Sequence, residues 1–398
     1  MRRVMITGVG TINALGVGVD AFANGLRAGR CAIGALSLFD TRGYRSACAA
    51  EVRGLTAPSW LSRALGRHAS RSDLLALVAA HEALATAHVS ERAALGIVIG
   101  ATTGGMHGSE EYYRRSLLEP RTDSHAMLTL PVSVSADLAA HIFGCQGPRL
   151  TVSTACSSGA NALGIAADWI RAGRADAVLC GGVDSLCRMT FSGFNALQAL
   201  DTVPCRPFDR DRAGLSLGEG AAMFVLEAQA YAAARGATPL AELCGYGISA
   251  DAHHITQPRP DGAGALLAMQ RALADSGVAA EEVDYVNAHG TATPLNDVIE
   301  TRALKALLGA RAARVPVSST KSMVGHCLAA AGAIEAVACV LALQHGFIPP
   351  TANLEHPDPE CDLDYVPQHS RMQSVRTVLS NSYGFGGNNT SVVLRRAA

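Results

Sequence analysis

The sequence predicts an α/β fold in which helices lie sandwiched between sheets. Short runs of β-branched and apolar residues alternate with alanine-rich helical stretches along the chain, which is typical of α/β layering. Several helical stretches are apolar nearly all round, and a helix without a polar face must be covered on both sides. The pattern restarts after Leu243, so we predict two halves, residues 1–245 and 246–398.

The first half alternates strands and helices in the manner expected of layered sheets. Its strand-like runs are 4–7, 96–100, 150–153, 177–180 and 222–226. Its helical candidates are 72–86 and 159–172, and Gly173 stands where a helix C-cap is expected.

The second half begins beyond a glycine-rich segment and a polar stretch that ends at Pro260. Its predicted elements are, in order, helix 264–276, strand 285–288, helix 297–308, strand 315–319 and helix 328–345. Each half contains a strand that ends in small polar residues and leads into a glycine- and alanine-rich helix, at 152–166 and at 317–336. This similarity indicates an internal duplication.

Bulk composition excludes several classes of protein. The 398 residues are 49% hydrophobic and 17% charged, which excludes disorder, and a net charge of −1 gives no support for nucleic-acid binding. The 11 cysteines form no C-x-x-C pair and no zinc-like spacing with histidine, so we expect no metal site and a reducing, cytoplasmic compartment. The apolar stretch 328–343 contains Glu335 and is expected to be a buried helix, not a membrane span.

The first chemical motif, 150–159, ends a β-rich run at Cys156 and opens a helix with small residues. A thiol at a helix N-terminus faces unpaired N–H groups and the positive end of the helix dipole, which stabilise thiolate and lower the pKa. We therefore interpret Cys156 as a nucleophile, whereas most of the other cysteines are expected to be buried and inert.

The second motif, 286–297, is a strand that ends in a turn at His289. Strand ends are where α/β folds place ligands, and a histidine there can donate or shuttle a proton near neutral pH. Thr291 and Thr293, two residues apart, can project the same way toward a polar ligand arm. A solvated loop histidine is the alternative.

The third motif, 317–326, places one of the only two lysines, Lys321, five residues before His326. In an arginine-rich chain, a lysine in a small-residue loop suggests a need for a compact ammonium that fixes a carboxylate or a histidine inside. The other lysine, Lys305, has the sequence context of an exposed helix residue. Chance placement of Lys321 stays an open alternative.

The fourth motif, 379–389, has the glycine spacing of a turn that exposes backbone amides and adopts positive φ. Such a turn can form an oxyanion hole, or it can be a tight connection between two strands. No dinucleotide fingerprint is present near the N-terminus, because Asn13 occupies the third glycine position, and there is no Walker-type loop.

These four motifs in this order, together with 7–10, 206–209 and 218–220, resemble the β-ketoacyl-ACP synthases of the thiolase superfamily, in particular the elongating type with one cysteine and two histidines. The resemblance spans essentially the whole chain. It implies a thiolase-like five-layered αβαβα fold built from two similar halves. The first half carries the nucleophilic cysteine, and the second carries the histidines, the lysine and the glycine-rich gate loop.

The resemblance also implies an acyltransferase and its mechanism. Cys156 would accept an acyl chain from an acyl carrier protein, and His289 and His326 would assist decarboxylation of malonyl-ACP before a Claisen condensation. The backbone N–H groups of Cys156 and Phe385 would form an oxyanion hole. No cofactor or metal is implied, because phosphopantetheine arrives on the carrier protein.

Supporting roles follow from the same resemblance. Lys321 would set the charge state of the site with Glu335 as its neighbour, Thr291 and Thr293 would bind pantetheine, and Phe385 would gate the acyl pocket. Thr103 matches a pocket-lining position. Tyr383 replaces the usual phenylalanine and Asn388 the usual threonine, so we expect a different gate polarity or motion.

The implied partners are an acyl carrier protein and a second subunit. Candidate docking residues for the acidic carrier are the arginines Arg63, Arg67, Arg71 and Arg206. A homodimer is expected, with a heterodimer containing a chain-length-factor-like, cysteine-less subunit as the alternative. No nucleic acid or membrane is expected as a partner.

Competing members of the superfamily differ at specific residues. A biosynthetic thiolase would need a second cysteine in 380–389, a starter-type synthase would carry asparagine in place of His326, and a chain-length factor would lack Cys156. A non-catalytic scaffold is disfavoured by the intact cysteine and histidines. Fatty-acid elongation is our main interpretation, and a specialised type II polyketide or polyene ketosynthase, which shares the chemistry, stays open.

Overall fold

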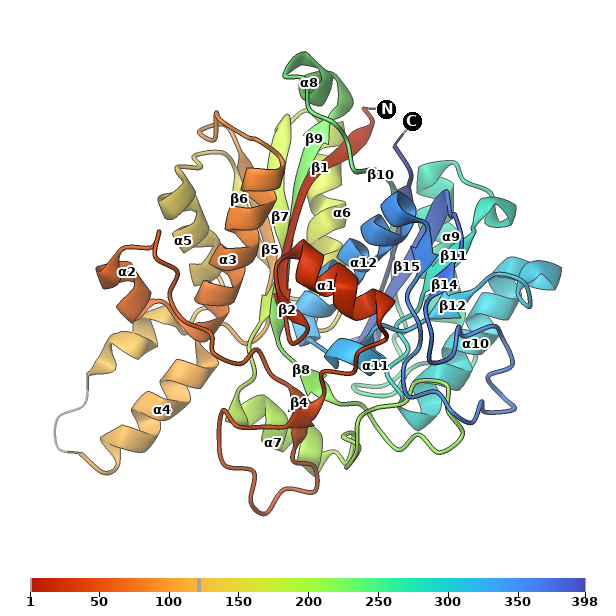
Figure 1. The fold of residues 1–398 in the computed structure, drawn as a ribbon, viewed down its shortest axis with the longest axis horizontal. Coiled ribbons are helices and arrows are strands. Elements are labelled where there is room, and N and C mark those ends of the chain that lie inside the picture. The colour runs from red at the N-terminus through yellow and green to blue at the C-terminus, as the bar shows by residue number, and fades with distance from the viewer. Residues whose placement is uncertain (1, 120–122, 398) are drawn as a thin grey trace.

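One long mixed sheet runs through the molecule and forms its framework (Figure 1). The structure is a computed structural model that describes residues 2–119 and 123–397, without the side chains of Ala64 and Arg67. The strands of the first half lie in the spatial order β1 (Val4–Asn13), β9 (Gly220–Ala228), β7 (Ala177–Asp184), β5 (Gly96–Gly100), β6 (Arg149–Val152). From β1 the second half continues as β10 (Ala241–Ala250), β16 (Asn388–Arg395), β15 (Thr377–Gly384), β11 (Tyr285–Asn287), β12 (Val317–Ser318).

The two halves of this sheet repeat one topology. Counted along the chain, the five strands of each half lie in the order 1-5-4-2-3 from the junction outward. In each half the two pairings nearest the junction are antiparallel and the two outer ones are parallel. β1 and β10 join the halves, with Met5 opposite Glu242 and Ile6 opposite Ala241. Residue 245 lies inside β10, and the division of the chain at that residue stays a prediction.

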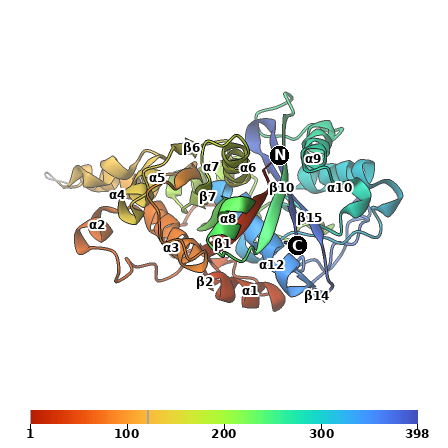
Figure 2. The ribbon, with the colours of Figure 1, turned by 90° about the horizontal axis from the view of Figure 1, so that it is seen from above.

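Helices cover both outer faces of the sheet and fill the space between its halves (Figures 1 and 2). The outer helices are α3 (Arg71–Thr86) and α5 (Val134–Phe143) on the first half, and α9 (Ala263–Ser276) and α10 (Pro294–Leu308) on the second. Two central helices, α6 (Ser158–Arg171) and α12 (Ala331–His345), contact strands of both halves. The five layers αβαβα that the resemblance implies are therefore confirmed.

The central helices are apolar all round because protein surrounds them. Every residue of α12 from Ala331 to Leu343 is buried. Small residues permit the close approach of the two helices, since a Cβ on Gly332 would lie 2.9 Å from the Cβ of Ala160. Within the described residues, Leu328–His345 is the one helical stretch long and apolar enough to cross a bilayer, and 89% of that window is buried inside the protein. It is the buried core helix that the sequence predicts.

Smaller elements complete the structure. The remaining helices are α1 (Val19–Arg27), α2 (Arg63–His68), α4 (Met106–Ser116), α7 (Arg188–Ala196), α8 (Gln229–Ala234) and α11 (Lys321–Val324), with 3-10 turns η1 (Ser124–Thr129), η2 (Ala280–Glu282), η3 (Gly309–Arg311), η4 (Leu328–Ala330) and η5 (Phe385–Gly387). The remaining strands are β2 (Gly16–Val17), β3 (Gly34–Ala35), β4 (Cys48–Ala50), β8 (Leu217–Gly218), β13 (Phe347–Ile348) and β14 (Arg371–Met372). β6 is an edge strand, and its Leu150 is 39% exposed.

Candidate active site

Cys156 lies in a tight turn between β6 and the N-terminus of α6. Ala155 adopts a left-handed conformation, with φ of 52°, which reverses the chain immediately before the cysteine. The Ser158 hydroxyl holds the turn by donating to the carbonyl oxygen of Ala155 at 2.6 Å and accepting the N–H of Thr154 at 2.8 Å. Cys156 lies where a strand ends and a helix begins. It is only 6% exposed, so its sulfur is largely shielded from water.

The electrostatics of this thiol differ from the sequence prediction. Burial raises the pKa of Cys156 to about 11, and the opposing effects of the Lys321 ammonium and the Phe385 backbone N–H are smaller. The predicted lowering of the pKa is therefore wrong for the free protein, because loss of hydration outweighs the donors around the sulfur. A thiol in this setting must lose its proton as it reacts.

His289 lies two residues after the end of β11, and its turn is fixed by a buried carboxylate. The backbone N–H groups of His289 and Gly290 donate to Glu300 on α10, at 2.9 and 2.8 Å. Thr291 and Thr293 follow on the same turn, with their hydroxyl oxygens 2.9 Å apart. Burial, with contributions from Lys321 and His326, lowers the pKa of His289 well below its usual value, so its imidazole is neutral.

His326 is held in one tautomer by its own backbone turn. Its Nδ1 accepts the N–H of Leu328 at 3.1 Å, so the proton of the neutral ring lies on Nε2. Burial, aided by Lys321, lowers the pKa of His326 well below its usual value. The two imidazoles lie edge to face, with ring centroids 5.4 Å apart. The pair therefore presents neutral rings that can donate hydrogen bonds without carrying charge.

Lys321 and Glu335 form a fully buried ion pair beside these rings. The Nζ of Lys321 donates to Oε1 of Glu335, and the two side chains are 1% and 2% exposed. Burial raises the pKa of Glu335 to about 7 despite the attraction of Lys321. Lys305 instead pairs with Asp362 at the surface, where its side chain is 44% exposed. The structure thus places the two lysines of the chain in opposite environments, as the sequence analysis expects.

The glycine-rich motif is a hairpin turn that closes over the cysteine. β15 and β16 pair antiparallel, and η5 between them carries Phe385, whose ring stacks on that of Phe194 at a centroid distance of 5.4 Å. The backbone N–H groups of Phe385 and of Cys156 face the sulfur. A Cβ on Gly384 would lie 3.2 Å from the backbone nitrogen of Cys156, so glycine permits this approach. The segment 385–387 is therefore a tight connection between two strands, which is one of the two alternatives from the sequence. It also exposes backbone N–H groups, as the other alternative requires.

A cavity of about 60 Å³ brings most of the predicted site residues together. It is lined by Cys156, His289, His326, Thr291, Thr293 and Phe385, among others. Tyr383 also lines it, and the Tyr383 ring lies 5.6 Å from that of His289. Asn388 donates from Nδ2 to the carbonyl oxygen of Phe385 at 3.1 Å. Lys321 and Glu335 stand behind the lining and act on it through charge.

Three residues predicted from the sequence are not placed in their predicted roles by the structure. Thr103 does not line the Cys156 cavity, and its N–H and hydroxyl donate to the buried Asp184 at 2.7 and 2.9 Å. Its place at the acyl pocket near the dimer interface stays a prediction. Arg71 is not a free docking residue, because its guanidinium donates to buried Glu219 at 2.7 and 2.5 Å. The side chain of Arg67 lies outside the described residues.

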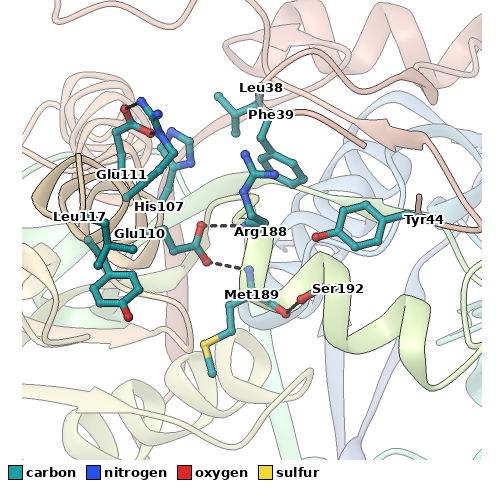
Figure 3. A pocket seen from close by; sticks show the side chains of 12 residues that line it. Leu38, Phe39, Tyr44, His107, Glu110, Glu111, Leu117, Arg188, Met189 and Ser192 are labelled. Atoms are coloured by element: carbon teal, nitrogen blue, oxygen red, sulfur yellow. Dashed lines mark hydrogen bonds and ion pairs between the residues drawn. The ribbon is translucent and has the colours of Figure 1, made fainter. Parts of the chain in front are cut away.

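A second and larger cavity, of about 570 Å³, lies on the other side of α7. Figure 3 shows Arg188 and Met189 at the start of α7 and Glu110 on α4, whose carboxylate accepts the N–H groups of both residues at 2.9 and 2.6 Å. Ser192 lines this cavity, whereas Phe194, two residues on, lines the Cys156 cavity. α7 is therefore a wall shared by the two spaces.

Sequence reasoning missed several residues that position the site. Glu300 and Asp184 anchor backbone turns near His289 and Cys156, and each is fully buried or nearly so. Asp184, the one acidic residue of the otherwise apolar β7, could be found from that contrast, whereas Glu300 lies in a helix with several polar residues and gives no such signal. Asn161 gives a similar signal, since it is the only polar side chain among the first nine residues after Ser158. Among the described residues no cluster of histidine, cysteine and acidic groups suitable for a metal is present.

Comparison with known families gives matches over most of the chain. Residues 1–232 match a family model described as Beta-ketoacyl synthase, N-terminal domain, and residues 240–355 match Beta-ketoacyl synthase, C-terminal domain. The 3-oxoacyl-(acyl-carrier-protein) synthase 2 of Synechocystis is 40% identical over 99% of this chain and 98% of that protein. The tetracenomycin polyketide synthase ketoacyl synthase alpha subunit of Streptomyces glaucescens is 42% identical over 99% of this chain and 97% of that protein.

Solved structures resemble this one over its full length. The ishigamide ketosynthase/chain length factor superposes with a TM-score of 0.95 at 37% identity, and covers 100% of both chains. A type II polyketide acyl-carrier protein in complex with its ketosynthase bound to the hexaketide gives a TM-score of 0.92 at 32% identity, again over 100% of both chains.

Proposed function

The chain belongs to the β-ketoacyl synthase family and is a condensing acyltransferase, and from this premise we propose how its residues act and what it elongates. We propose a β-ketoacyl-acyl-carrier-protein synthase that extends a Cys156-bound acyl chain with malonyl-ACP in fatty-acid elongation. One observation carries the proposal. A buried thiol and two neutral imidazoles line the same cavity, and backbone N–H groups face the sulfur.

The first half-reaction is transfer of the acyl group to Cys156. The sulfur of Cys156 attacks the thioester carbonyl, a new carbon–sulfur bond forms, and the bond to the pantetheine sulfur breaks. The thiol proton leaves Cys156 and ends on the departing pantetheine thiol. The N–H groups of Cys156 and Phe385 are suited to hold the transient oxyanion. Burial disfavours the thiolate of Cys156, and these preorganised N–H donors offset that cost by stabilising the oxyanion as the thiol reacts.

The second half-reaction uses the two histidines. Malonyl-ACP loses carbon dioxide, and the electron pair of the broken bond forms an enolate whose oxygen accepts hydrogen bonds from His289 and His326. The enolate carbon then attacks the acyl thioester, and Cys156 leaves as thiolate and takes up a proton. Neutral histidines suit this step, because they donate hydrogen bonds to the developing charge and do not first surrender a proton.

Other residues bind and tune the site in this proposal. Thr291 and Thr293 bind the pantetheine arm at the cavity entrance, and Phe385 gates the acyl pocket through its stack on Phe194. Burial and, to a smaller extent, the charge of Lys321, which is paired with Glu335, keep both imidazoles neutral. The reaction requires no cofactor of the chain's own, since phosphopantetheine arrives on the carrier protein.

The partners are an acyl carrier protein and a second subunit, in a cytoplasmic enzyme. The exposed edge of β6 leaves backbone groups that a second sheet can pair, which favours a dimer across this edge. A homodimer is our main proposal. The similarity to a ketosynthase/chain length factor favours, as the second candidate, a type II polyketide or polyene ketosynthase with a cysteine-less partner.

Intact-protein mass spectrometry tests the proposal. Wild type and Cys156→Ala are exposed to saturated, polyenoyl and aromatic acyl-carrier proteins, and malonyl-ACP is added afterwards. We expect an acyl adduct on wild type only, a preference for saturated chains, and a β-ketoacyl product. A preference for polyenoyl or β-keto chains would select the second candidate. Condensation that survives Cys156→Ala would contradict the mechanism.

A further inference from the structure

One face of α6 is fixed to the second half of the molecule directly behind the cysteine turn. Asn161 and Gly164, one helical turn apart, lie against Tyr246 of β10. A Cβ on residue 164 would lie 2.3 Å from the Tyr246 ring, so only glycine lets this ring pack closely enough for its hydroxyl to reach Asn161. Further along the helix, Arg171 donates to Asp275 at 2.7 Å and to the carbonyl oxygen of Cys244 at 2.6 Å. α6 is thus attached to the second half near both of its ends.

Asn161 uses every hydrogen-bonding position of its amide. Its Nδ2 donates to the hydroxyl of Thr154 at 2.7 Å and, more weakly, to that of Ser157 at 3.4 Å. Its Oδ1 accepts from the hydroxyls of Tyr246 at 2.8 Å and Thr390 at 2.7 Å. A carboxamide offers two donor hydrogens and two acceptor sites, so its capacity is filled. The donors point to the cysteine turn, and the acceptors point to β10 and β16 of the other half.

The cysteine turn needs such an external anchor. Ala155 is held at positive φ, a conformation that costs energy for a residue with a side chain and persists only where the surroundings enforce it. The hydroxyls of Ser157 and Ser158 donate only within the turn, to Thr154 and Ala155. Asn161 instead ties Thr154 and Ser157, on either side of Cys156, to the half that carries His289 and His326.

We propose that Asn161 is a positioning residue, which sets Cys156 in register with the two histidines by linking the cysteine turn to β10 and β16. It is 6% exposed and is not among the residues that line the cavity, so it acts through the turn and not on substrate. The proposal rests on the proposed function, since it assigns Asn161 to acylation of Cys156. A polar core residue with a purely structural role would change stability and both half-reactions alike.

The experiment separates the two half-reactions in the full-length protein. Acylation of Cys156 by octanoyl-pantetheine is followed by intact mass, and decarboxylation of malonyl-pantetheine is followed as released carbon dioxide. We expect Asn161→Ala to slow acylation by up to about 100-fold, the effect of a misplacement near 1 Å, and to leave decarboxylation unchanged. Tyr246→Phe removes the hydroxyl that donates to Oδ1 of Asn161, and it should slow acylation by about 2- to 10-fold.

A pH profile provides the readout that a structural role would not change. Asn161→Asp keeps the acceptors for Tyr246 and Thr390, and its buried carboxyl can donate to Thr154 only when protonated. We expect its acylation rate, divided by the wild-type rate at the same pH, to recover as the pH falls from about 8 to about 5, whereas the same ratio for Asn161→Ala shows no such recovery. Tyr365→Phe is the matched control, because it removes a buried tyrosine hydroxyl that bonds to Thr301, away from the turn.

The outcomes are distinct. Slower acylation with normal decarboxylation, and recovery of Asn161→Asp at low pH, would support the assignment. Equal losses in both half-reactions, or no loss in either, would overturn it. If Asn161→Ala does not fold, the acylation rate of Tyr246→Phe is compared with that of Tyr365→Phe. Slower acylation in Tyr246→Phe alone would support the assignment, and equal rates would overturn it. A wild-type protein that is not acylated at all would overturn the proposed function itself, whereas an acylated wild type with unaffected variants would overturn only the role of Asn161.

Discussion

Arg71 and Glu219 form a buried ion pair. Its removal should lower the free energy of unfolding and leave binding of the carrier protein unchanged. The Arg71 side chain is 14% exposed and that of Glu219 is 0% exposed. The Glu219 carboxylate also accepts the N–H groups of Val52 at 2.8 Å and Leu186 at 3.0 Å, so it cannot turn toward water. Arg71→Met keeps most of the apolar stem and leaves a buried carboxylate without a cation, which costs about 3–5 kcal/mol of the free energy of unfolding.

Urea unfolding at one protein concentration measures this loss, since the stability of a dimer depends on concentration. Arg302→Met is the matched control, because Arg302 and Glu360 pair at the surface with 55% and 64% of their side chains exposed. Removal of that pair should cost less than about 1 kcal/mol. The KM for the acyl carrier protein should stay unchanged in Arg71→Met. A raised KM with a free energy of unfolding near that of wild type would refute the structural role and restore Arg71 as a docking residue.

Three further predictions concern the site. Burial raises the pKa of Cys156 to about 11, so its alkylation by iodoacetamide, followed by peptide mapping, should become faster as the pH rises toward that value. A rate that reaches a plateau near neutral pH would contradict a protonated thiol. Phe194→Ala removes the ring on which Phe385 stacks, so it should increase the alkylation rate of Cys156 severalfold at fixed pH and widen the range of acyl chains accepted, with Phe191→Leu as a core control. Burial raises the pKa of Glu300 to about 7, so its carboxyl binds a proton more tightly in the folded protein than in the unfolded chain, and the stabilisation present at low pH is lost as the pH rises from 4.5 toward 7. In Glu300→Gln the urea midpoint should fall less over this range than in wild type, and an equal fall in both would count against the shift.

The layered fold and the core of the site could be predicted from sequence because both depend on local patterns. Apolar periodicity located the two central helices and seven of the ten strands on the path of the main sheet, since a helix such as α12 without a polar face has to lie between layers. It did not locate β10, β15 and β16. Cys156, His289 and His326 stand at element ends, and the topology carries those ends to one cavity. Local sequence also distinguished Lys321 from Lys305.

Long-range contacts account for what the sequence did not show. The raised pKa of Cys156 arises from burial by segments distant in the chain, which a helix-terminus argument does not include. Arg71 pairs with Glu219, 148 residues away, and therefore resembled a surface arginine when judged by its neighbours alone. The partner of a buried polar group is set by tertiary packing.

The repeated strand order gives the molecule an approximate twofold axis that relates its halves. The same operation relates the buried helices, and each begins beside the cavity: α6 at Cys156, and α12 shortly after His326. An arrangement with equal halves would place identical side chains at both starts, whereas this chain places Cys156 before one and His326 before the other. In the proposed function the two sides of this repeated framework carry complementary roles, a nucleophile in one half and hydrogen-bond donors in the other, so neither half would contain a complete site alone.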